Sequence, residues 1–237
     1  MKKKLKWTLN RLGYSINKIN STPLLKDDYL EAIKDTIDLN PTLFDVGANQ
    51  GQTVKKFLSH YPISEIHSFE PSKICYEALK KNFSNSKSLK LNNNALGSKK
   101  EFLNFNEYSW SALNSLLKRS FTKSKIIDTY DVEVTTVDSY CNENNISKIS
   151  ILKTDTEGYE LEVLKGAKRM IEQNLIQFIH CEVFFYENYI GQSSFGDLYN
   201  YLIRNGYDLV RFYEFEYTTK GYANRTDALF INEKFQQ

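Results

Sequence analysis

The sequence predicts a doubly wound α/β domain built on a mostly parallel β-sheet. The first observation is that short strand-like runs alternate with helical stretches from residue 43 onward, the order that produces parallel strands joined by helices. The second is that the runs 43–46, 149–152 and 176–179 are apolar without polar alternation, as strands covered on both faces are. The third is a turn with two glycines, residues 47–51, directly after the first run. Such a turn is typical of the switch point of an open α/β sheet.

The alternation places each element in order. We expect strands at 43–47, 65–70, 88–92, 132–137, 149–154, 176–182 and 207–213, and helices at about 51–60, 72–84, 138–145, 160–173 and 195–205. The region 95–131 interrupts the alternation with an extra strand at 101–106 and a loop rich in serine and lysine. Long loops inside compact domains often cover a binding site. The run 227–231 predicts a last strand, antiparallel and at or near the sheet edge.

Residues 1–40 differ in character from the domain that we expect over residues 41–237. The first 26 residues carry seven lysines and arginines and no acid, and the rest of the chain has a net charge of −5. Leucines and isoleucines recur there at spacings of three and four, which predicts a basic amphipathic helix, followed by a short helix at 27–39. The apolar face could dock on the domain or on a second copy of the chain, or residues 1–20 could lie on an anionic membrane surface.

Composition excludes several classes of protein. Apolar residues make up 41% and charged residues 25%, which is typical of globular domains, and no apolar run is long enough to span a membrane. Cys75, Cys141 and Cys181 are too few and too far apart for a disulfide framework or a zinc site, so we expect a cytoplasmic protein. The acidic body lacks a basic patch, which argues against nucleic acid as a partner.

The first turn and the end of the next strand carry the residues that indicate a cofactor. Asp45, Gly47, Asn49 and Gly51 follow the spacing Asp-x-Gly-x-Asn-x-Gly, and Glu70 ends the second strand. Glycine lets a ligand approach the backbone closely. An acid at the end of the second strand can accept hydrogen bonds from a ribose diol. Together they predict an adenosine cofactor, although a tight strand–helix turn without a ligand would need the same glycines.

The spacing also favours one adenosine cofactor over the others. Glycines at 47 and 51 do not match the dinucleotide or phosphate-binding loops. Asp45 would repel a pyrophosphate and attract a sulfonium and an ammonium group, which indicates S-adenosylmethionine. We expect Asn49 to bind its amino-acid end, Glu70 its ribose, and Asn94 with Ala95 its adenine; Asn94 could equally be an ordinary turn residue.

Acidic residues at the ends of two later strands predict the reaction side. Asp155 is the candidate to orient or deprotonate an acceptor hydroxyl. Glu157, three residues after Thr154, could instead complete a capping box for the next helix.

On the following strand, His180 and Glu182 share one face. His180 could be a base or an interior histidine. Glu182 could receive substrate hydroxyls or share a divalent cation with Asp155, but so few acids are weak support for a metal, and we predict none.

The motifs Phe44–Gly51, Ser68–Pro71, Asn94–Gly97 and Leu152–Glu160, followed by Val163–Ala167, resemble the FkbM family of methyltransferases over residues 42–232. The resemblance implies a class I methyltransferase (Rossmann-like) fold with a seven-stranded sheet and an antiparallel last strand. It implies S-adenosylmethionine bound by Gly47, Asn49, Gly51 and Glu70, with Asp155 at the reaction centre. The family usually has aliphatic residues where Thr154 and Thr156 stand, a mild departure.

The expected function is therefore O-methylation of a saccharide, glycolipid or related natural product. The alternatives are methylation of RNA or protein, or cofactor binding without turnover. The family's acceptors vary, so the resemblance does not identify the substrate.

Overall fold

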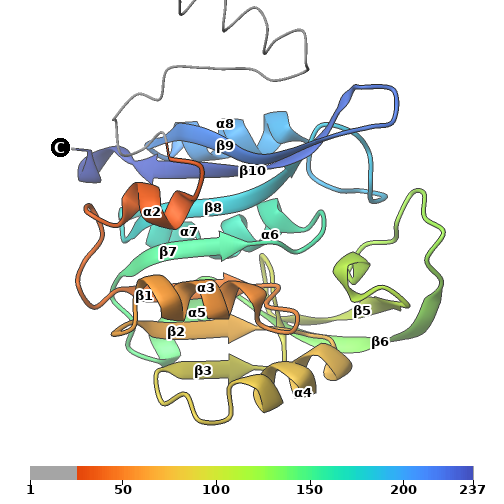
Figure 1. The fold of residues 1–237 in the computed structure, drawn as a ribbon, viewed down its shortest axis with the longest axis horizontal. Helices are drawn as coiled ribbons and strands as arrows, with labels where there is room; N and C mark the ends of the chain where they lie inside the picture. Colours follow the sequence, from red (N-terminus) through yellow and green to blue (C-terminus); the bar gives the residue numbers. More distant parts are fainter. Residues whose placement is uncertain (1–25, 237) are drawn as a thin grey trace, which may run out of the picture.

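The computed structural model describes residues 26–236 and contains the predicted mostly parallel sheet (Figure 1). Seven strands form it in the order β3-β2-β1-β7-β8-β10-β9, and β10 runs antiparallel to both of its neighbours. The strands are β1 (Thr42–Val46), β2 (Glu65–Phe69), β3 (Leu89–Asn92), β7 (Ile149–Thr154), β8 (Ile176–Phe184), β9 (Tyr207–Tyr217) and β10 (Ala223–Asn232). The predicted antiparallel last strand is confirmed; it lies one position in from the edge, which β9 forms.

Helices cover both faces of this sheet, which explains why its strands are apolar on both sides (Figure 1). Leu43 packs with Phe57 in the core below α2 (Tyr29–Ile33) and α3 (Gln52–His60), with α4 (Lys73–Asn82) beside α3. The next residue, Phe44, points to the other core. That core is closed by α5 (Val137–Glu143), α6 (Glu160–Gly166), α7 (Lys168–Glu172) and α8 (Phe195–Arg204).

A second, three-stranded sheet occupies the region that interrupts the alternation. It has the order β4-β6-β5, formed by β4 (Ala95–Leu96), β6 (Ile126–Thr135) and β5 (Glu101–Tyr108). The extra strand predicted at 101–106 is confirmed as β5. A strand is present near the predicted range 132–137, but its predicted place in the main sheet is wrong. Residues 132–135 form the end of β6, which pairs antiparallel with β5 in the second sheet. Figure 1 shows this sheet beyond the carboxyl ends of β1 and β2.

Two predicted helices are shorter than expected. The helix expected over 160–173 is divided at Ala167, because the Asp138 carboxylate accepts hydrogen bonds from the backbone N–H groups of Arg169 and Met170 and so starts α7 separately. The helix expected at 27–39 is reduced to α2, which Asp28 caps by accepting from Leu30 N at 2.9 Å.

The predicted amphipathic helix of the first 20 residues lies outside the described part of the chain. Within residues 26–236, no helix is long and apolar enough to cross a membrane.

Candidate active site

A cavity of about 290 Å³ opens at the carboxyl ends of β1, β2 and β7, where the sequence predicts the cofactor. Both sheets contribute to its lining: Gly47–Asn49 and Glu70 from the main sheet, Ala95 and Leu96 from β4, residues 111–116 from the loop after β5, and residues 155–157 after β7. The main sheet therefore supplies the floor, and the inserted region supplies the opposite wall.

The glycine turn serves packing as well as access. Gly47 has φ +78°, and a Cβ there would lie 1.9 Å from the carbonyl oxygen of Asp155, so only glycine lets the loops after β1 and β7 touch. Gly51 has φ +96° and starts α3; a Cβ there would lie 2.2 Å from the Phe83 ring. Gly47 lines the cavity, whereas Gly51 lies outside its lining and fixes how α3 packs on α4.

Glu70 and Asn49 meet in the cavity, as expected of residues at the ends of neighbouring parallel strands. The backbone N–H of Asn49, which has φ +47°, donates to Glu70 Oε2 at 2.7 Å, and the N–H of Ser72 donates to Oε1 at 2.8 Å. Each carboxylate oxygen keeps a second lone pair for a further donor. Burial raises the pKa of Glu70 to about 7, against the two backbone hydrogen bonds, which lower it.

Asp45 does not lie beside the cofactor cavity, so its predicted contact with a cationic cofactor is wrong. Its side chain is fully buried, does not line the cavity, and forms an ion pair with Lys153, Oδ1 to Nζ 2.9 Å, across the β1–β7 pairing. Lys153 also donates to the carbonyl oxygen of Gly47 at 3.2 Å. The charge of Asp45 is thus matched by a lysine of the sheet, and the pair stiffens the turn from below.

Asn94 also lies outside the cavity lining, with its side-chain amide 3.3 Å from the carbonyl oxygen of its neighbour. Ala95 does line it, together with Leu96, Phe105 and Phe69. These side chains make one end of the cavity apolar, which suits a flat heterocycle.

The loop after β7 places Asp155 at the opposite end. Its carboxylate is half-exposed, and Oδ2 lies 3.6 Å from Lys153 Nζ. The capping role considered for Glu157 belongs to Glu160, whose Oε1 accepts from Thr156 N at 2.8 Å and from Gly158 N at 3.2 Å. Glu157 itself has φ +55°, and its side chain turns into the protein.

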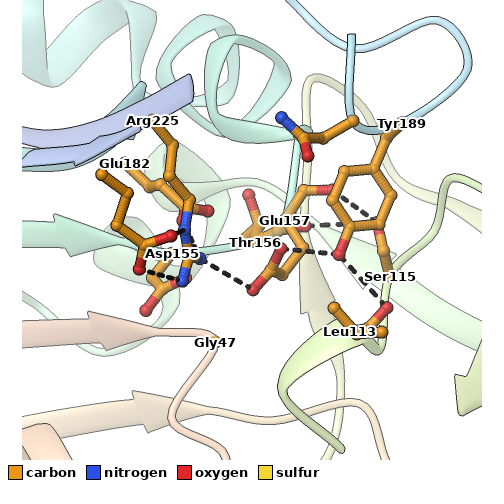
Figure 2. Close-up of polar contacts among 12 residues, drawn as sticks. Gly47, Leu113, Ser115, Asp155, Thr156, Glu157, Glu182, Tyr189 and Arg225 are labelled. Atoms are coloured by element: carbon orange, nitrogen blue, oxygen red, sulfur yellow. Dashed lines mark hydrogen bonds and ion pairs between the residues drawn. The ribbon is translucent and has the colours of Figure 1, made fainter. Parts of the chain in front are cut away.

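Glu157 is held there by residues from distant parts of the chain (Figure 2). The hydroxyl of Tyr189 donates to its Oε2 at 2.6 Å, and the Ser115 hydroxyl donates to its carbonyl oxygen at 2.9 Å. Burial, reinforced by the nearby Asp155 charge, raises the pKa of Glu157 to about 8. The Asp155 loop is therefore fixed by both the inserted region and the segment after β8.

Glu182 lies beside this loop but in neither cavity wall, because β8 continues to Phe184 instead of ending at residue 182. Arg225 on β10 pairs with it, Nη1 to Oε1 2.6 Å, and approaches Glu157 Oε1 at 3.8 Å (Figure 2). One oxygen each of Asp155, Glu157 and Glu182 lie within 4.8 Å of one another, close enough to share a divalent cation. The guanidinium of Arg225 already supplies positive charge to two of these three carboxylates.

His180 is buried and stacked on Tyr29, with ring centroids 3.9 Å apart. Burial and the nearby Lys153 charge lower its pKa to about 3, so the ring is neutral. It faces a second cavity on the other side of Lys153 and Asp155.

Sequence reasoning assigned no role to Lys153 or Arg225. Lys153 could have been found, because a lone lysine inside an apolar strand needs an acid on a neighbouring strand, and Asp45 is the lone acid of β1. Arg225 gives no comparable signal, since its strand carries polar residues along much of its length.

This fold and this site, a seven-stranded sheet with one antiparallel strand and an acid at the end of β2, define a class I methyltransferase. Residues 45–209 match the model of the methyltransferase FkbM domain, and the chain belongs to that family.

Curated relatives agree with the family. "Methyltransferase sdnD" of Sordaria araneosa is 28% identical over 185 residues, which cover 65% of this chain and 71% of the relative. "2-O-methyltransferase NoeI" of Sinorhizobium fredii is 22% identical over 165 residues, 65% of this chain and 67% of the relative.

Among solved structures, methyltransferase FkbM from Methylobacillus flagellatus has the same fold, with a TM-score of 0.52 and 16% identity over 81% of this chain. The match spans 44% of the length of that crystallised protein.

Proposed function

We propose that this protein transfers a methyl group from S-adenosylmethionine to a hydroxyl of a saccharide, glycolipid or related natural product. The observation that carries the proposal is one cavity with an apolar end, a buried carboxylate at its centre and a half-exposed carboxylate at its far end: Phe105, Glu70 and Asp155.

The cavity fits the parts of this cofactor in order. Ala95, Leu96 and Phe105 would hold the adenine, and the free lone pairs of Glu70 would accept hydrogen bonds from the two ribose hydroxyls. Asn49, Gln52 and Thr53 at the start of α3 would hold the amino-acid end.

Bound S-adenosylmethionine supplies an electrophilic methyl group: a C–O bond forms, the S–C bond breaks, and the hydroxyl loses its proton. Asp155 would take that proton; its accessible carboxylate, which borders both cavities, supports this role. Transfer to oxygen is also what the name of the relative NoeI describes.

The remaining parts of the proposal concern partners and place. The acids that border Asp155 disfavour RNA as the acceptor, because they repel a phosphate backbone. The three cysteines are buried and unpaired, which suits the reducing cytoplasm.

Calorimetric titration tests the cofactor first. We expect S-adenosylmethionine to bind while NAD and ATP do not, and Glu70→Gln to weaken binding at least tenfold, because an amide cannot accept both ribose hydroxyls in the same way. Equal binding by the variant would remove Glu70 from the site, and no binding by the folded wild type would overturn the proposal.

Asp155→Asn then separates binding from transfer. We expect unchanged cofactor affinity and methyl transfer slowed roughly 100-fold or more, as for loss of a general base. Unchanged turnover would exclude Asp155 as the base.

A further inference from the structure

A second cavity of about 450 Å³ adjoins the first. Lys153 and Asp155 line both, and so do Gln52 and Thr53 at the start of α3. The second cavity continues from there across β8, β9 and β10 toward the residues just before α2. A molecule in the second cavity would therefore meet Asp155 from the side opposite the proposed cofactor.

The lining of the second cavity is polar and mainly acidic. No aliphatic side chain is part of it; five carboxylates and two lysines are, namely Asp27, Asp28, Asp155, Glu214, Asp227, Lys56 and Lys153. Lys153 is already paired with Asp45, outside the cavity; Lys56 stands 3.9 Å from Glu214, and Arg211 pairs with Asp27 at 3.0 Å. Negative charge remains in excess, so phosphate and carboxylate groups are disfavoured, and donors of hydrogen bonds are favoured.

His180 gives an independent sign of a ligand. Its side chain is only 5% exposed, and its Nε2 has no hydrogen-bond partner within the described residues. Asp227 Oδ2 lies 3.8 Å from it, beyond hydrogen-bond distance. A buried ring nitrogen of this kind is normally paired, and here it lines a cavity in which a ligand group can reach it.

Two phenol rings complete the wall. Tyr29, stacked on His180, and Tyr213 line the cavity and are almost fully buried. Because Tyr29 stacks on His180 and Arg211 lies over the Tyr213 ring, these rings close the wall, and the carboxylates with His180 are the groups that can bind hydroxyls.

We propose that the second cavity binds the acceptor, and that the bound part is a hydroxyl-rich ring without anionic groups, a neutral or amino sugar, held by His180 and Asp227 with the reacting hydroxyl at Asp155. This rests on the proposed methyl transfer and specifies its acceptor: uronic acids and phosphorylated sugars are rejected in the second cavity, and an ammonium group is accepted.

Saturation-transfer NMR with methyl glycosides tests this on the full chain with saturating S-adenosylhomocysteine. The probes are methyl glycosides of the gluco, galacto and manno series, each neutral, 2-amino or uronic. We expect neutral and amino probes to give signals at least fivefold stronger than their uronic counterparts. Equal signals for uronic probes, or no signal from any neutral or amino probe, would overturn the proposal.

Variants locate the binding. Asp227→Asn with Glu214→Gln should weaken the amino-sugar signal at least fivefold, and Glu133→Gln, on the exposed face of β6, should leave it unchanged. Since Glu214 is exposed, Glu214→Gln alone will fold and should still reduce the preference for the amino probe. Unchanged signals in both variants would place the acceptor elsewhere.

Calorimetry on the same samples separates the two proposals. If the cofactor binds but the second-cavity variants leave the probe signals unchanged, only the proposed acceptor site is wrong. If the cofactor does not bind, the proposed methyl transfer itself is wrong.

Discussion

Two groups of buried charges lie on either side of Asp155, and they are balanced differently. Asp45 and Lys153 form an ion pair between neighbouring strands, and both side chains are almost completely buried; the half-exposed Asp155 lies 3.6 Å from the same lysine. In the other group, Arg225 alone serves Glu182, Glu157 and Glu216. In the first group the one buried carboxylate has a buried cation of its own, and in the second the carboxylates outnumber the cation.

The difference indicates which group is structural and which is adjustable. The Asp45–Lys153 pair fixes the backbone of the glycine turn, because Lys153 also donates to the carbonyl oxygen of Gly47. In the Arg225 group, burial and mutual repulsion raise the pKa of Glu182 well above its usual range and that of Glu157 to about 8. Protons can therefore enter and leave this group near neutral pH, beside the residue that we propose as the base.

The largest effect should come from breaking the Asp45–Lys153 ion pair. Lys153→Met leaves Asp45 as an unpaired buried charge, and such a loss costs roughly 3–5 kcal/mol of unfolding free energy. Denaturant titration measures it. The double variant Asp45→Asn with Lys153→Met removes both charges and should recover much of the lost unfolding free energy. A Lys153→Met variant as stable as wild type would show that the ion pair does not stabilise the fold.

Arg225→Met should cost less, about 2 kcal/mol, because the remaining carboxylates can take up protons and Arg225 is partly exposed. The same denaturant titration compares the two variants directly. Arg225→Lys keeps the charge but not the fork that binds Glu216 and Glu182 together, so an intermediate value is expected. A loss greater than that of Lys153→Met would reverse the comparison.

Per unit of pH, the smallest change is expected in the pH dependence of stability. Glu157 has a folded pKa of about 8, whereas an unfolded glutamate titrates near about 4.3. The folded state thus binds more protons in this window, and its stability falls as pH rises from 4.3 to 8, by at most about 1.4 kcal/mol per unit for one group.

Unfolding free energies at pH 5, 6, 7 and 8 check this slope. Glu157→Gln cannot titrate, and its curve should be shallower than that of wild type. Parallel curves would mean that Glu157 is already ionised at pH 5.

The main sheet was predictable because its signals are local. Each apolar strand from β1 to β8 is followed by an amphipathic helix or a turn, and parallel pairing follows from that order. The pairing of 132–135 with β5 was not predictable in this way. A strand's own residues show which face is buried, but not which strand lies beside it.

The site shows the same limit. Glu70 and Asn49 could be placed together because the ends of adjacent parallel strands converge. Arg225 could not, since it reaches Glu182 only through the insertion of β10 between β8 and β9, a contact between residues 43 positions apart. His180 was correctly placed on β8, but only the structure shows that it faces a second cavity.

The position of β10 has a consequence for synthesis on the ribosome. Strand β10 lies between β8 and β9 and pairs with both. Until residues 223–232 emerge, β8 and β9 therefore each expose unpaired backbone groups. Arg225 arrives with the same strand, and until then Glu157 and Glu182 lack that cation. A nascent chain that pauses before residue 223 would carry an open sheet edge prone to pairing with other chains. The emergence of β10 is therefore the step that closes the sheet and brings Arg225 to Glu157 and Glu182.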